Sequence, residues 1–412
     1  MALATGASPL PRGDSYRWAV LGAAVMSQTT ASIVAQGIYT LVPFFQAAFH
    51  LSQASAALAV SAVNAGQVAS MLLMGWLIDK HGERGVVGCT AIVMGAAALC
   101  AATASRYAAL LGFLFVLGIG YASVQPGGTR AILRWFAPAQ RGMATGIRQA
   151  GLPLGTALAA MLLPLLASAY GWQRALLVQG AIGIAGGLLF VLVYRGAGSG
   201  EPRAAPPPSP LRLIRAIRSD KALWPVMLAG LAMVTFQYTF ATHVLTFLAS
   251  RFGMPLVAAG LLYAVSQWLG IAGRIGLAWI SDHLWPGRRM RSLTAVMFAC
   301  AAALLALLAM PGDTPLWMLV AIFGVVGIFG VGWYPLYLLE VAEMAPKTAV
   351  ASTIGFSMTL NMVSISIAPP LFGFVVDHAG YTPAWLSLAA LVALAALHLG
   401  MRSGRAGAPV AG

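Results

Sequence analysis

Three ionisable side chains, Arg148, His243 and Arg274, lie deep inside apolar stretches of this sequence. A charge in a bilayer is costly unless it serves binding or transport, so each is a candidate functional residue. Arg274 stands eight residues before Asp282, about 12 Å along a helix and near the middle of a hydrocarbon layer about 30 Å thick. Since no carboxylate is near it in sequence, we expect its planar guanidinium to bind an anionic substrate. The alternative is a structural arginine that caps carbonyls or pairs with a loop acid.

Arg148 and His243 are further candidate substrate-binding residues, each with an open alternative. Arg148 lies about two turns into its apolar run and either faces the same cavity or extends its long stem towards the membrane surface. His243 titrates near neutral pH and is the one histidine well inside an apolar run. It either carries a coupled proton or is a core histidine bonded to a carbonyl.

Polar and aromatic side chains in other apolar stretches complete the candidate binding site. They are Gln28, Gln36, Tyr39, Tyr121, Gln125, Gln237, Tyr238, Trp333, Tyr334, Tyr337 and Asn361. Any one of them could instead pack in the core or at the membrane interface. All ten carboxylates fall in loops or at the ends of apolar stretches, so we expect no acid at mid-membrane.

Long apolar helices must position these residues, and the composition agrees. Of the 412 residues, 60% are hydrophobic and 8% charged, against about 25% charged in soluble proteins. We predict an all-α membrane protein of twelve spans of roughly 20 residues. The expected spans are 18–43, 55–79, 86–105, 108–134, 142–168, 172–194, 222–250, 257–281, 292–310, 314–340, 349–376 and 383–401. Without a phosphate loop, metal-ligand cluster or nucleophile–base pair, we expect no enzyme activity, cofactor or metal.

The chain repeats itself at about half its length. Trp76-Leu77-Ile78-Asp79-Lys80-His81 is echoed by Trp279-Ile280-Ser281-Asp282-His283, and Tyr170-Gly171-Trp172 by Ala379-Gly380-Tyr381. A duplicated hydrophobic half is typical of a transporter built from two related helix bundles. We therefore predict bundles at 1–194 and 222–412, joined by a cytoplasmic linker at 195–221 that is rich in Gly, Pro and Arg.

The formal charge of +14 is distributed unevenly between the two predicted sides of the membrane. Arg106, Arg174 and Arg251 fall in predicted outer loops, whereas most other basic residues fall in inner segments and the linker. The positive-inside rule then predicts a multi-pass protein of the inner (cytoplasmic) membrane with both termini cytoplasmic. We expect anionic lipid headgroups, not nucleic acid, to be the partner of this charge, and we expect a monomer.

The stretch Gly75–Arg84 resembles the signature loop of the major facilitator superfamily, G-x-L-x-D-[RK]-x-G-[RK]-[RK], with Glu83 where a basic residue is usual. The resemblance covers nearly the whole chain and implies two pseudo-symmetric six-helix bundles that alternate access. It also implies gating roles for Asp79, Lys80, Arg84 and Asp282 at the inner helix ends. Asp79 would pair with cations or accept backbone N–H bonds and so latch the outward-open state; the alternative is a solvated loop carboxylate.

The stretch Gly273–Asp282 resembles the eighth span of monocarboxylate transporters and the oxalate/formate exchanger, in which the matching arginine binds the substrate carboxylate. Asn361 stands where the exchanger has a second cation, which favours a substrate with one carboxylate. Leu114 and Leu117 replace the Arg and Gln of proton-driven family members. We predict a carrier of a small organic anion and favour a monocarboxylate as its substrate. The sequence does not decide whether transport is coupled to protons. The alternatives are a drug or metabolite efflux carrier and a membrane sensor without transport.

Overall fold

The computed structural model describes residues 16–194, 223–284, 289–345 and 350–405, so the predicted linker lies outside the described residues. The described part is almost entirely helical and contains no strand. Twelve segments are long and apolar enough to cross a membrane, which confirms the predicted all-α membrane fold. The first half contains α1 (Tyr16–Phe49), α2 (Gln53–His81), α3 (Glu83–Ala101), α4 (Tyr107–Tyr121), α5 (Val124–Trp135), α6 (Pro138–Gln149), α7 (Gly151–Tyr170) and α8 (Trp172–Val193). The second half contains α10 (Leu223–Phe252), α11 (Leu256–Leu284), α12 (Arg289–Ala309), α13 (Leu316–Val326), the π-helix η1 (Gly327–Val331), α14 (Tyr334–Met344), α15 (Val350–Ala379) and α16 (Tyr381–Arg405).

Several of the spans are interrupted helices. The fourth span joins α4 to α5, the fifth joins α6 to α7, and the tenth runs through α13, η1 and α14. Interruptions and π-turns in membrane helices are often found at functional sites, where the freed backbone meets a cavity or a neighbouring helix. Each interruption lies within a few residues of a side chain that lines the central cavity, namely Gln125, Gln149 and Tyr334.

Glycines allow two pairs of helices to approach closely, one pair in each half. A Cβ atom on Gly118 of α4 would lie 1.9 Å from the carbonyl oxygen of Val63 in α2. In the second half, a Cβ atom on Gly273 of α11 would lie 2.5 Å from the carbonyl oxygen of Ile328 in η1. Small residues permit such close contact between membrane helices. The two close contacts join the second span to the fourth and the eighth span to the tenth. They therefore occupy corresponding places in the two halves of the repeat.

Gly171 and Gly380 connect the fifth span to the sixth and the eleventh to the twelfth. They adopt φ values of +87° and +84°, in the left-handed region that other residues rarely occupy. The echo seen in the sequence around these glycines therefore corresponds to the same tight turn in both halves.

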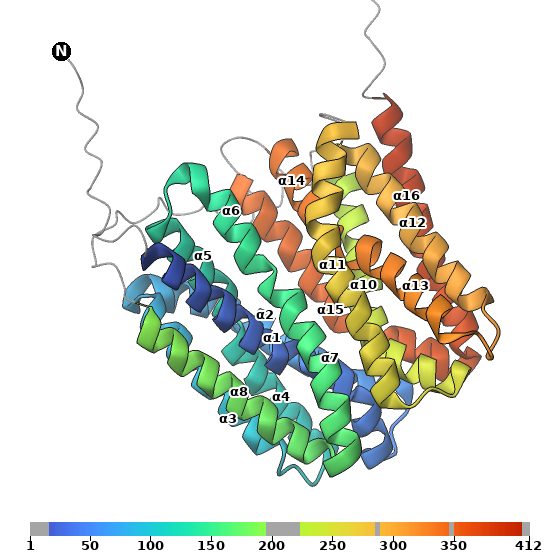
Figure 1. The fold of residues 1–412 in the computed structure, drawn as a ribbon, viewed down its shortest axis with the longest axis horizontal. Coiled ribbons are helices and arrows are strands. Elements are labelled where there is room, and N and C mark those ends of the chain that lie inside the picture. The colour runs from blue at the N-terminus through green and yellow to red at the C-terminus, as the bar shows by residue number, and fades with distance from the viewer. Residues whose placement is uncertain (1–15, 195–222, 285–288, 346–349, 406–412) are drawn as a thin grey trace, which may run out of the picture.

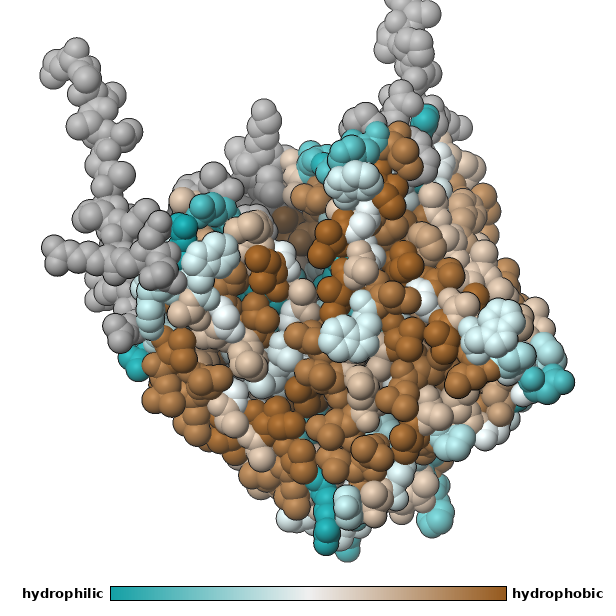
Figure 2. Space-filling view, in the orientation of Figure 1, coloured by the Kyte–Doolittle hydropathy of each residue, from teal (hydrophilic) through white to brown (hydrophobic). Residues whose placement is uncertain are grey.

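The two groups of helices, α1–α8 and α10–α16, lie side by side and meet at one end of the molecule (Figure 1). There α2 contacts α15 and α7 contacts α11. Ser61 Oγ donates to the Ser366 carbonyl at 2.5 Å, an acceptor that has no helical donor because Pro370 lacks an N–H. Gly260 lies against Ala160 and Pro164. At the opposite end, where α2 finishes at His81, the groups separate and the surface is hollowed (Figure 2).

The flanks of the molecule are apolar. Figure 2 shows a broad hydrophobic surface between hydrophilic ends, and side chains such as Leu72, Leu192 and Ile275 are largely exposed. Satisfied helical backbones that present apolar side chains outwards are what a hydrocarbon environment requires.

Candidate functional site

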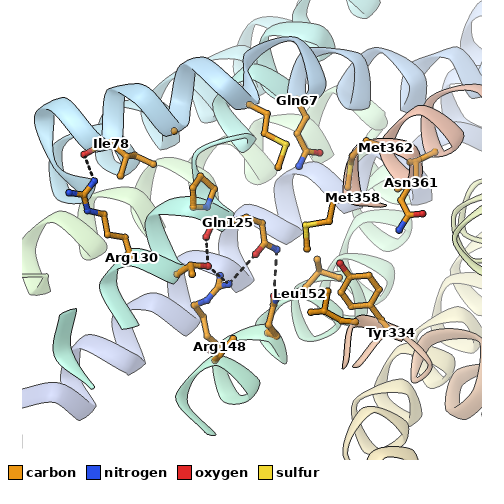
Figure 3. Close-up of a pocket in the computed structure, with 18 of the residues that line it drawn as sticks. Gln67, Ile78, Gln125, Arg130, Arg148, Leu152, Tyr334, Met358, Asn361 and Met362 are labelled. Atoms are coloured by element: carbon orange, nitrogen blue, oxygen red, sulfur yellow. Dashed lines mark hydrogen bonds between the residues drawn. The ribbon is translucent and has the colours of Figure 1, made fainter. Parts of the chain in front are cut away.

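A cavity of about 1770 Å³ lies between the two groups of helices and opens at the end of the molecule where Asp79 lies. Its inner part is lined by Arg274, Tyr238 and Asn361, and its mouth by Asp79 and Arg130. Figure 3 shows side chains from both halves pointing into this space. The cavity is large enough for a small organic substrate together with water.

Arg148, at the end of α6, is only 1% exposed and is held by neutral acceptors. Its Nη1 donates to Gln28 Oε1 at 2.8 Å, and its Nη2 donates to Thr129 Oγ1 at 3.4 Å. Nη2 also donates to Gln125 Oε1 at 3.0 Å (Figure 3). Gly128 leaves room for the guanidinium, because a Cβ atom there would lie 2.8 Å from Nη1. Arg148 therefore lies in the cavity wall and links α1, α5 and α6, and its side chain does not extend to the membrane surface.

Arg274, on α11, also lines the cavity. Within the described residues it has no ion pair or hydrogen bond, and its Nε is buried without a partner. The phenol groups of Tyr238 and Tyr334 lie close enough to act on it electrostatically. A guanidinium in this position can bind a carboxylate through two parallel hydrogen bonds.

Half of the fourteen residues predicted for binding line the cavity. They are Gln125, Arg148, Gln237, Tyr238, Arg274, Tyr334 and Asn361. The interrupted spans position the N-terminal members, since Gln125 follows the break between α4 and α5, and Arg148 precedes the break between α6 and α7. Besides Arg148, two of these side chains are bonded to neighbours. Gln237 Oε1 accepts from Trp333 Nε1 at 2.9 Å, and Gln125 Nε2 reaches Gln149 Oε1 at 3.5 Å.

Six of the other predicted residues lie behind this lining. Gln28 bonds Arg148, and the Tyr121 hydroxyl lies near the side chains of Gln28 and Gln36. Tyr39 accepts from Asn64 Nδ2 at 3.0 Å, and its ring lies 5.8 Å from that of Tyr238. Trp333 bonds Gln237, and Tyr337 bonds Ser357. These residues are placed to hold the lining side chains, not to touch a ligand in the cavity.

His243 is fully buried in the second half and is not brought to the cavity. Its Nε2 lies 2.9 Å from the carbonyl oxygen of Pro369 in α15, and its ring packs on Phe372 at a centroid distance of 4.9 Å. This geometry matches the alternative that the sequence left open, a core histidine bonded to a carbonyl.

The predicted gating residues lie at the open end of the cavity, and the structure gives each of them a partner. Asp79 pairs with Arg130 Nη1 at 2.5 Å. Lys80 lies over the Trp76 ring at 4.9 Å, and Arg84 Nε donates to the Val191 carbonyl at 2.8 Å. In the other half, Arg289 bridges Asp282, at 3.1 Å, and Glu343. In this conformation each of these contacts stays within one half.

Glu83, the residue that departs from the signature loop, is 1% exposed. Arg134 Nη1 lies 3.1 Å from Glu83 Oε1, Arg130 Nε lies 3.6 Å from Oε2, and the Tyr194 hydroxyl donates to Oε1. The sequence reasoning missed both arginines, although a signal existed. The pairs Asp79–Arg130 and Glu83–Arg134 have the same separation of 51 residues, as expected for two acids facing two cations across adjacent helices.

The sequence reasoning also missed several lining residues. They are Gln67, Met71, Thr129, Thr145, Gln149, Leu152, Val234, Leu338, Met358, Met362 and Ile365. Gln67 carried a signal as an amide inside an apolar run, but the methionines and aliphatic residues resemble ordinary core positions. Among the described residues, no group of three or more His, Cys, Asp or Glu is arranged to hold a metal ion.

The family model and the relatives that match this chain point to the same family. The model described as Major Facilitator Superfamily matches residues 21–369. The chain is 29% identical over 391 residues to the uncharacterized MFS-type transporter Rv2994 of Mycobacterium tuberculosis, covering 94% of this chain and 86% of the relative. It is 24% identical to the probable sulfoacetate transporter SauU of Cupriavidus necator, covering 92% of each. It is 25% identical to monocarboxylate transporter 11 of Homo sapiens, covering 94% of this chain and 84% of that protein.

Solved structures agree with the fold. A bacterial homologue of the human lysosomal transporter Spinster, in an inward-facing and occupied conformation, superposes with a TM-score of 0.74 at 16% identity, covering 94% of this chain and 96% of the other. A peptide transporter POT in complex with sulfate superposes with a TM-score of 0.78 at 16% identity, covering 94% and 95%. At these identities the likeness concerns the fold alone.

Proposed function

Because this chain belongs to the Major Facilitator Superfamily, we propose that it carries a small organic anion, a monocarboxylate, across the inner membrane by alternating access. The observation that carries this proposal is Arg274, which lines the cavity and has no ion pair or hydrogen bond within the described part of the chain. A cation in such surroundings is costly unless a counter-ion occupies the site for part of the cycle.

The contrast between the two cavity arginines supports binding at Arg274. Both terminal nitrogens of Arg148 donate to the oxygens of Gln28, Gln125 and Thr129. Few of its guanidinium N–H groups are therefore available to a ligand. Arg274 has the Tyr238 and Tyr334 phenols as neighbours, and these can donate to a carboxylate that the guanidinium holds. Several relatives are named as transporters of organic acids, sulfoacetate and hexuronate among them, which favours the same substrate class.

We assign the open end of the cavity to the cytoplasm, because the segments at this end carry most of the basic residues. Residues 1–194 and 222–412 act as the two rocking bundles. Substrate bound at Arg274 favours a conformation in which the Asp79 and Asp282 ends approach each other and the α2–α15 contact opens. In the present conformation Asp79 and Asp282 are each bonded within their own half. Their contacts with the opposite half therefore form when this end of the cavity closes.

Purified protein screened by thermal shift against small organic acids tests this function. A ligand at 100 times its dissociation constant adds about 2.7 kcal/mol of stability, and we expect Arg274→Gln to abolish that gain while the unliganded protein stays folded. Arg251→Gln is the matched control, since Arg251 is an exposed cation that bonds the Met310 carbonyl away from the cavity. Equal stabilisation of Arg274→Gln and wild type by the same acid would contradict the proposal.

Efflux of an amphipathic compound is the second candidate function. The side chains of Met71, Trp76, Met358 and Met362 supply an adaptable apolar wall. This function predicts binding of neutral or cationic amphipathic compounds that is insensitive to Arg274→Gln, so the same screen separates the two candidates.

A further inference from the structure

The amide group of Gln237, on α10, has a fixed orientation. Its Oε1 accepts a hydrogen bond from Trp333 Nε1 at 2.9 Å. Because an indole N–H can only donate, the amide oxygen must face Trp333 and the amide nitrogen must point the other way. That nitrogen, Nε2, has no partner among the described residues and is not enclosed by them, and Gln237 lines the cavity. The two N–H groups of Nε2 are therefore available to a ligand there.

Trp333 is held firmly enough to set this orientation. It stands at the break between η1 and α14 and is fully buried. Its ring packs against those of Tyr334 and Tyr337, at centroid distances of 5.5 and 5.3 Å. A flipped Gln237 amide would bring an N–H group against the indole N–H, which would lose the bond and leave a buried donor unpaired.

The same break in the tenth span lies against the helix that carries Arg274. A Cβ atom on Gly332, next to Trp333, would lie 2.8 Å from the carbonyl carbon of Gly273, next to Arg274. Glycines at such a contact let two helix backbones touch without side chains between them. Trp333 is therefore fixed relative to α11 and to Arg274.

The residues that follow Gln237 and Trp333 in the chain flank Arg274. Tyr238 and Tyr334 line the cavity, and their phenols lie close enough to act electrostatically on the guanidinium. The Nε of Arg274 is enclosed, but its terminal nitrogens, which have no partner among the described residues, are not. The guanidinium, the two phenols and the Gln237 amide thus belong to one part of the cavity wall.

We infer that Gln237 is a second anion-binding residue beside Arg274, and that Trp333 is the positioning residue that turns the Gln237 amide nitrogen towards the bound carboxylate. This inference rests on the proposed function and adds a neutral donor to its site. An ionised carboxylate offers about four lone-pair sites. The bidentate fork of Arg274 leaves some of them free, and Gln237 Nε2 donates to one of these.

A double-mutant cycle tests the inference. The affinities of pyruvate, lactate and propionate are measured for wild type, Gln237→Met, Trp333→Phe and the double variant. Gln237→Met keeps the length of the side chain but removes both donors, so we expect each acid to bind about tenfold more weakly. Trp333→Phe keeps a buried ring but frees the amide to rotate, and should weaken the same acids by up to about tenfold. In the Gln237→Met background it should cost no further affinity, because Trp333 acts through the amide.

Trp385→Phe is the matched control for the loss of an indole. Trp385 is also fully buried in the second half, but its Nε1 has no hydrogen-bond partner among the described residues, so we expect binding as in wild type. Trp333→Leu is a second positioning variant with the same expectation as Trp333→Phe. Unfolding midpoints are measured in parallel, so that affinities are compared between folded proteins.

The outcomes separate this inference from the proposed function. If Arg274→Gln abolishes binding but Gln237→Met binds the acids as wild type does, anion binding stands and the role of Gln237 is overturned. Additive losses from Gln237→Met and Trp333→Phe would overturn the positioning role of Trp333, since a residue that acts by packing alone weakens binding in either background. If no acid binds to wild type, or binding is insensitive to Arg274→Gln, both the proposed function and this inference are overturned.

Discussion

The carboxylate of Asp377, at the end of α15, accepts hydrogen bonds from the backbone N–H groups of Gln53, at 2.8 Å, and Ala54, at 2.9 Å. These N–H groups belong to the first turn of α2, in the opposite half of the chain. A carboxylate at a helix N-terminus is stabilised by the helix dipole. Gly373, one turn earlier, allows the approach, because a Cβ atom there would lie 2.6 Å from Ala54 N.

Asp377→Asn should weaken this contact at the closed end and shift the protein towards conformations open at that end. The amide keeps the size of the side chain but loses the charge that interacts with the α2 dipole. Spin labels at Ser105 and Thr314, in the loops of the two halves at this end, would report longer distances in a cysteine-free background. Gly373→Ala should act in the same direction by forcing the helices apart.

Asp313→Asn is the control for Asp377→Asn, since Asp313 is an exposed carboxylate in a loop at the same end. An unaltered distance distribution in both Asp377→Asn and Gly373→Ala would show that Asp377 caps α2 without holding the halves together.

Arg148→Gln should destabilise the protein by about 1–3 kcal/mol, the range for leaving buried polar groups unpaired. The loss would leave Gln28 Oε1, which is buried, without the donor that it has now. Chemical or thermal unfolding measures the change. In the double variant with Gln28→Leu the two effects should be less than additive, because both remove the same bond. Strict additivity would contradict the view that this bond stabilises the wall.

Glu83→Gln should be strongly destabilising, by about 3 kcal/mol, because it removes the buried charge that Arg130 and Arg134 contact. Glu343→Gln is the matched control. Glu343 also pairs with an arginine at the open end, but its side chain is 56% exposed, and exposed pairs contribute about 1 kcal/mol or less. Equal unfolding midpoints for the two variants would show that Glu83 does not stabilise this end.

His243→Gln should lower stability and leave any proton-driven accumulation of substrate as in wild type. The ring is buried against Phe372 and bonded to the Pro369 carbonyl, so we expect it to act by packing between α10 and α15. Uptake into proteoliposomes with and without an imposed pH gradient checks this. Loss of gradient-driven accumulation with intact exchange would instead give His243 a part in coupling.

The sequence alone determined the class of fold and predicted the height of side chains along their helices. Apolar runs of sufficient length must satisfy their backbones as helices in lipid, so twelve spans could be predicted. Gly171 and Gly380 marked matching turns because few other residues adopt their backbone angles. Counting residues along a helix placed Arg274 near mid-membrane, and the tertiary structure places it in the cavity lining.

Only the tertiary structure decided which face of each helix meets the cavity and which distant groups pair. Height along a helix is set by local geometry, but the direction of a side chain depends on how that helix is rotated against its neighbours. Tyr334 and Tyr337 stand on the same helix, yet of the two only Tyr334 lines the cavity. The pairing of Asp79 with Arg130 and the bond from the α2 backbone to Asp377 join segments far apart in the chain. Such contacts depend on the packing of whole helices, which no local pattern of residues specifies.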